Sequence, residues 1–185
     1  MQNMKQHVKT LLATLCLLIL CGAQCAEAQQ HLTFQGISFD NSFQAFGKAL
    51  VAQGYEMDEE DNDFFYGKFL GEEATLLLAQ TPKTHRTNSL FISSATSYTD
   101  VKECAKVAGA ICGQLEELYN CSIEIDEENT SSVLHSYGFL ENEDGTPYGY
   151  ISVNVTKDDE EGTFDWNVYF SDHINENLYS EEGGE

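Results

Sequence analysis

Apolar residues recur along this chain with two different periods, and each period predicts one kind of secondary structure. Phe43, Phe46 and Leu50 fall on one face of a helix. Residues 40–42 are all good N-cap types, and Gly54 is a typical residue just beyond a helix C-terminus. The pattern therefore predicts a helix that starts at residues 40–42 and is ended by Gly54.

A longer apolar stripe predicts a second helix. Ser97 or Thr99 is the expected N-cap, and Asp100 forms a loose capping box with Ser97. Several members of the stripe are small, so the helix can lie close against a sheet, and we interpret the stripe as packing. Its members are Val101, Cys104, Ala105, Ala108, Cys112, Leu115 and Tyr119.

Strict alternation predicts strands in most of the remaining chain. The clearest are residues 150–156 and 163–171, in which every second residue is apolar. Residues 32–35, 63–70, 73–80, 89–97, 122–126 and 133–140 are also strand-like. Turn residues at 71–72, 143–145 and 158–162 predict hairpins. The fold class is therefore α+β, an antiparallel sheet with two helices packed on one face.

The length and this element order predict one domain over residues 29–179. Its halves, 31–97 and 98–179, fit a tandem repeat of one helix and three strands, although identity between the halves is low. Residues 180–185 are expected to be a disordered tail.

The first 28 residues predict a cleavable signal peptide. Lys5 and Lys9 precede an apolar run over residues 11–20, and Ala26-Glu27-Ala28 is an A-x-A cleavage site. The run is shorter than a membrane span. Lipid anchoring at Cys21 or Cys25 and an uncleaved anchor are less favoured alternatives. We expect export to the periplasm or beyond.

The charge balance of the chain limits the classes of partner that it can bind. The chain has 9 Lys and Arg against 31 Asp and Glu, a formal charge of −22, and loss of residues 1–28 makes it one unit more acidic. Nucleic acids and anionic membranes are disfavoured because both need basic contacts. Most carboxylates are expected to be solvated. The expected partner is another protein, and no cofactor is expected.

Three cysteines would remain after export, and we interpret them as small buried hydrophobic residues. Cys104 and Cys112 are eight residues apart on the second predicted helix, about 12 Å between Cα atoms, which is too far for a disulfide. Cys112 and Cys121 could pair only if that helix ended early.

Short motifs resemble those of small secreted Bacteroides-type proteins of unknown function. Residues 32–37, followed by 40–42, resemble the opening of these proteins, and residues 67–71 resemble their "G-x-F-x-G" hairpin. Residues 168–175 resemble their closing strand and turn, whereas residues 121–146 depart from them. The resemblance implies a fold like that of the β-lactamase inhibitor protein (BLIP-like), and it implies no function.

No catalytic or metal-binding motif is evident. Residues 58–63 are acidic, yet they lack the alternation of an EF-hand loop, so no metal site is predicted. The alternative to a binding protein is a periplasmic hydrolase-type enzyme, whose site would bring His135 or His173 to a carboxylate or a cysteine through the fold.

The preferred prediction is a non-enzymatic binding module that uses the uncovered face of its sheet. Tyrosine gives a large contact area at a low entropy cost, and amides adapt to many partners. The residues expected on this face are Tyr66, Tyr150, Asn154, Asn167 and Tyr169.

Overall fold

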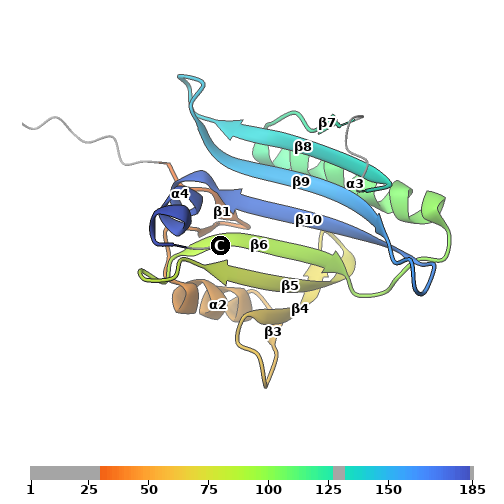
Figure 1. The fold of residues 1–185 in the computed structure, drawn as a ribbon, viewed down its shortest axis with the longest axis horizontal. Helices are drawn as coiled ribbons and strands as arrows, with labels where there is room; N and C mark the ends of the chain where they lie inside the picture. The colour runs from red at the N-terminus through yellow and green to blue at the C-terminus, as the bar shows by residue number, and fades with distance from the viewer. Residues whose placement is uncertain (1–29, 127–131, 184–185) are drawn as a thin grey trace, which may run out of the picture.

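The computed structural model describes residues 30–126 and 132–183, so the predicted signal peptide lies outside the described residues. Three helices and ten strands follow one another in these segments (Figure 1). In chain order they are β1 Thr33–Phe34, β2 Ile37–Ser38, α2 Phe43–Ala52, β3 Glu56–Met57, β4 Phe64–Phe69, β5 Glu72–Gln80, β6 Thr87–Ser94, α3 Val101–Tyr119, β7 Glu124–Ile125, β8 Leu134–Glu141, β9 Pro147–Lys157, β10 Phe164–Asp172 and α4 His173–Glu181.

Eight of the strands form one antiparallel sheet, in the order β3-β4-β5-β6-β10-β9-β8-β7. Each half of the chain supplies one long helix and four consecutive strands. The halves meet where β6 pairs with β10, with Val168 opposite Ile92. The fold is therefore α+β with an antiparallel sheet, as the alternating patterns predict.

The hydrophobic core lies on one face of this sheet. Leu76, Ile92 and Val168 stand in one row across β5, β6 and β10, and all three are completely buried. The buried faces of α2 and α3 belong to the same core, and Figure 1 shows both helices behind the strands. The third helix, α4, follows β10 and contacts β6, β9 and β10.

The first predicted helix is confirmed as α2, with Ser42 as its N-cap. The second is confirmed as α3, although its predicted cap is wrong. Asp100 caps it by accepting a hydrogen bond from the backbone N–H of Lys102, because an ionised carboxylate stabilises the positive end of the helix dipole. Asn120 ends it in the left-handed conformation, so the helix does not end early.

The sequence predicted a disordered tail from residue 180, whereas the chain is still helical there. Ser180 and Glu181 are the last residues of α4, a third helix that the sequence patterns did not predict. Glu182 accepts hydrogen bonds from the backbone N–H groups of Lys83 (2.7 Å) and Thr84 (3.2 Å), which holds this end against the β5–β6 loop. The helix was missed because its face carries Asn175 rather than an apolar stripe.

The two outermost strands sit in matching positions and share a sequence motif. Residues 56–61 read E-M-D-E-E-D and residues 124–129 read E-I-D-E-E-N. Glu56 pairs with Tyr66 on β4, and Glu124 pairs with Tyr137 on β8. A glycine follows each of these tyrosines in the sequence.

Both glycines allow a close approach of the segment that leads into the outer strand. A Cβ on Gly67 would lie 2.6 Å from the ring of Tyr55, and one on Gly138 would lie 2.5 Å from the carbonyl oxygen of Ser122. No side chain fits at either distance without displacing its neighbour.

Candidate binding face

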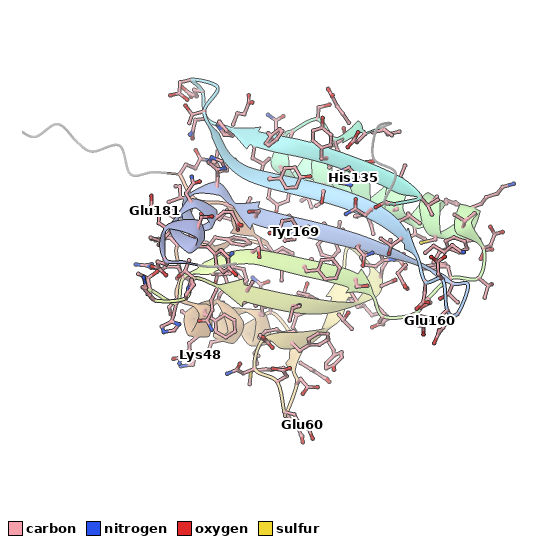
Figure 2. The ribbon with its side chains drawn as sticks, in the orientation of Figure 1. Lys48, Glu60, His135, Glu160, Tyr169 and Glu181 are labelled. Carbon is pink, nitrogen blue, oxygen red and sulfur yellow. The ribbon has the colours of Figure 1, made fainter. Side chains whose placement is uncertain are left out.

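The uncovered face of the sheet, here called the open face, carries the residues that alternate with the core set. All five residues that the sequence predicted for this face occupy it: Tyr66, Tyr150, Asn154, Asn167 and Tyr169. Figure 2 shows Tyr169 and His135 on the side of the sheet that faces the viewer. The registers therefore place these side chains together, as strict alternation requires.

One row of the open face is almost entirely apolar. The pairing runs from Phe64 through Leu77, Phe91, Tyr169 and Ser152 to Tyr137. Tyr150 on β9 and Phe139 on β8 face each other in the next row of the same face. We call the set of large apolar members the aromatic band: Phe64, Leu77, Phe91, Tyr137, Phe139, Tyr150 and Tyr169.

The aromatic band remains accessible to solvent. Leu77 is 37% exposed, Phe91 39% and Phe139 53%. The rings of Tyr150 and Tyr169 lie 6.5 Å apart and those of Phe139 and Tyr150 5.4 Å apart, within the range of favourable aromatic pairs. Contiguous exposed apolar surface of this kind is typical of interaction sites.

Two residues that the sequence predicted as contact residues, Asn154 and Asn167, are instead held by hydrogen bonds within the face. Asn167 is only 6% exposed, and its side-chain amide donates to the hydroxyl of Thr156 at 2.8 Å. The amide of Asn154 contacts the ring of His135. These amides hold the face together, so Tyr150 and Tyr169 are better contact residues than Asn167.

Carboxylates border the open face at both of its outer strands. The hydroxyl of Tyr66 donates to Asp58 at 3.0 Å. The pKa of Asp58 is lowered by hydrogen bonds from the backbone of Glu60 and from Tyr66. At the opposite edge, Asp126 lies 4.0 Å from Nε2 of His135.

Sequence reasoning missed several members of the face, among them Phe64, Leu77, Phe91, Tyr137 and Phe139. Leu77 and Phe91 lie in runs whose residues are apolar at consecutive positions, so the facing of each residue cannot be read from alternation alone. The signal that could have found Tyr137 is the repeated motif, because it makes Tyr137 the counterpart of Tyr66.

A groove lies where the aromatic band reaches the edge of the sheet at β8. It has a volume of about 690 Å³, and its lining includes Tyr119, Cys121, Tyr137, Phe139 and Tyr148. Only the first part of β8 pairs with β7, through Ser136 and Tyr137. The band therefore ends in a hollow with aromatic walls.

The two histidines considered for catalysis lie in different parts of the fold. His135 stands on the open face between Asn154 and Asp126. His173 begins α4 and lines a cavity of about 440 Å³ together with Glu181 and Tyr148. The described residues that line the His173 cavity include no cysteine. The two contacts of His135 given above are to an amide and a carboxylate.

The three cysteines of the described segments are free thiols. Burial raises the pKa of Cys104 to about 11 and that of Cys112 to about 11, and it also raises the pKa of Cys121. All three are consequently protonated at neutral pH, a state in which a thiol is a poor nucleophile.

The acidic loop after β3 is organised by its own backbone. Asp58 accepts hydrogen bonds from the N–H groups of Glu60 (2.8 Å) and Asp61 (3.1 Å). Residues 30–126 and 132–183 contain no group of three or more His, Cys, Asp or Glu side chains that could hold a metal ion.

Comparison of this chain with known proteins found no match. No known protein family, no curated protein and no solved structure matches this chain. Among the helices of the described segments, none has the length and apolar character needed to cross a membrane.

Proposed function

We propose that this protein is an exported, non-enzymatic binding module that holds a partner protein against the open face of its sheet. The observation that carries the proposal is the exposed aromatic band on the face of the sheet opposite the core. Apolar side chains in water favour burial, at about 25 cal/mol per Å² removed from solvent. A partner that covered Leu77, Phe91 and Phe139 would gain this energy.

The size of the open face supports a protein partner. Seven strand spacings of about 4.8 Å separate β3 from β7, which gives a width of about 34 Å. With strands of about eight residues, the area is on the order of 800 Å², which is the contribution of one partner to a standard protein interface.

The chemistry of the side chains supports binding over catalysis. The thiols are protonated, and burial is the main cause. His135 lies between Asp126 and Asn154, and the amide of Asn154 contacts its ring, which fits a histidine held within the face. The tyrosines of the band need no activation to act as contact residues.

The arrangement of the fold supports a duplicated origin within a BLIP-like architecture. Each half contributes one helix to the core and four strands to the eight-stranded sheet. Each outer strand begins an E-x-D-E-E sequence, which a Tyr-Gly pair follows further along the chain. We propose that the halves descend from one ancestral unit, with β6 and β10 as equivalent strands at the junction.

Site-specific photo-cross-linking in the cells that produce the protein tests the binding proposal. A photoreactive residue replaces Phe91 at the centre of the band, and in a matched control it replaces the exposed Lys106 on α3. We expect a discrete protein adduct from position 91 that is missing from position 106. Identical adducts at both positions, or none at position 91, would refute the proposal.

The same cells test export. Fractionation should place the mature chain outside the cytoplasm, with its N-terminus at Gln29 by mass spectrometry. A full-length chain in the cytoplasm would contradict the predicted signal peptide.

A further inference from the structure

We propose that the partner contributes an extended strand, which pairs with the free main-chain edge of β8 at Phe139 and places side chains in the groove at that edge. This inference rests on the proposed function, and it adds to it the conformation of the segment that is bound. It follows from a difference between the two outer edges of the sheet.

The main chain of β4 and that of β8 have the same orientation at their outer edges. The carbonyl oxygens of Phe64 and His135 point outward, because each accepts a hydrogen bond from the adjoining outer segment, at 2.9 Å and 2.8 Å. Main-chain groups alternate in direction along an antiparallel strand, so Lys68 and Phe139, four positions further along, also direct theirs outward. Both residues lie beyond the pairs that β3 and β7 form.

The edge at β4 is closed by a tyrosine. The hydroxyl of Tyr55 donates to the carbonyl oxygen of Lys68 at 3.1 Å, and its ring lies so close to Gly67 that a Cβ there would be 2.6 Å away. The side-chain amide of Gln35 donates to the same hydroxyl at 3.1 Å, which holds it in place. The main chain of β4 is therefore covered beyond β3.

The edge at β8 carries an isoleucine in the matching place. Ile123 and Tyr55 each precede the glutamate of an outer strand, and each side chain lies against the glycine that follows the paired tyrosine. Isoleucine has no hydroxyl, so it cannot donate to the carbonyl oxygen of Phe139 as Tyr55 does to that of Lys68. Among the described residues β8 has only β7 and β9 as strand neighbours, so the outward N–H and C=O of Phe139 have no strand partner.

The groove runs along this free edge. Residues 138–141 of β8 all line it, and consecutive residues of a strand point to opposite faces of a sheet, so the hollow follows the edge itself. The rest of its lining comes mainly from residues 119–122 and from Tyr148. Residues 139–141 offer about 10 Å of strand, which accommodates about three residues of an added strand.

An unpaired main-chain donor and acceptor beside a groove select an extended chain as the occupant. A strand satisfies both groups of Phe139, and its alternate side chains enter the groove and extend the aromatic band. A helix offers no free main-chain groups along its side. A second copy of this chain is opposed by charge, because each copy carries a formal charge of −22 and the groove includes Glu124 and Glu141. The occupant is therefore a strand of a different protein.

The first measurement needs no partner. Amide hydrogen exchange followed by NMR compares Phe139 with Tyr137, which stands in the β7 pairing. We expect the amide of Phe139 to exchange on the order of tenfold faster or more. Equal protection of the two amides would show that the edge is already closed, and it would overturn the inference.

The second measurement uses a displayed library of random linear peptides, selected against the whole chain. Ile123→Tyr copies Tyr55 and should close the edge, and Ile123→Val is the matched control. We expect the affinity of the selected peptides to fall about tenfold or more with Ile123→Tyr and less than about twofold with the control. Circular dichroism checks that both variants are folded.

A third measurement changes the peptide and leaves the protein as it is. Single N-methylations along a selected peptide remove its main-chain donors one at a time. Only every second donor of a paired strand points toward its neighbour. We therefore expect affinity losses at alternate positions, together with slower exchange of the Phe139 amide in the complex.

The outcomes separate the two proposals. Peptides that tolerate Ile123→Tyr, or that show no alternation on N-methylation, would overturn the added strand, as would a selection that yields no binder. The binding face is judged separately, by the adduct from position 91. Failure of the strand pairing is therefore distinguishable from failure of the proposed function.

Discussion

Removal of the Asp172 side chain should strongly destabilise this fold. Its side chain is completely buried at the junction of β10 and α4. It accepts hydrogen bonds from the backbone N–H groups of Leu32 (2.7 Å) and Asn175 (2.9 Å). Nδ1 of His31 lies 3.1 Å from the same carboxylate. One carboxylate therefore ties the start of the domain to its last helix.

The substitution Asp172→Ala leaves two buried donors without an acceptor and removes the N-cap of α4. Each hydrogen bond to a charged group contributes about 1.5 to 3 kcal/mol, and loss of a cap costs about 1 kcal/mol. Because these effects share one carboxylate, they are not additive. We expect the free energy of unfolding to fall by about 3 to 5 kcal/mol.

Urea unfolding followed by tryptophan fluorescence measures this loss, since Trp166 is the only tryptophan and is fully buried. Asp159→Ala is the matched control, because the side chain of Asp159 is 88% exposed and pairs with Lys157 at the surface. It should change the stability by less than about 0.5 kcal/mol. A loss of under about 1 kcal/mol for Asp172→Ala would refute the role assigned to this carboxylate.

Three further outcomes are expected. Gly138→Ala should lower the free energy of unfolding by about 2 to 4 kcal/mol, because the added Cβ would clash with the main chain of Ser122. Gly109→Ala, at a position with open space on α3, should raise the free energy of unfolding by up to about 1 kcal/mol, and urea unfolding measures both changes. Alkylation of Cys112 should accelerate with pH up to about 11, and a plateau near pH 9 would contradict its raised pKa. Tyr66→Phe should raise the pKa of Asp58, measured by NMR titration, because the hydroxyl donates to the ionised carboxylate; an unchanged pKa would show that this bond is absent in solution.

The alternating patterns predicted the strands because their facing is set locally. In β9 and β10 every second residue is buried, and in β10 this includes Trp166, Val168 and Phe170. The periodicity of α3 was equally informative, since its buried residues fall at helical spacing. These elements need no knowledge of their neighbours to be recognised.

What the sequence did not reveal depends on contacts between distant segments. The helix α4 is held by polar groups, among them Asn175, whose amide donates to the carbonyl groups of Phe39 (2.8 Å) and Thr87 (2.9 Å). No apolar period records such bonds. The strand order, which joins β6 to β10, is also a long-range property, and it decides that Phe91 lies beside Tyr169.

The two acidic edges and the aromatic band have one physical explanation in common. Outer strands expose backbone groups to other chains, and charged side chains there oppose uncontrolled strand pairing. Here β3 and β7 are only two residues long and carry Glu56 and Glu124. The charges that protect the edges also surround an apolar centre. Strand pairing at β3 and β7 is therefore opposed, whereas the aromatic band between them remains exposed.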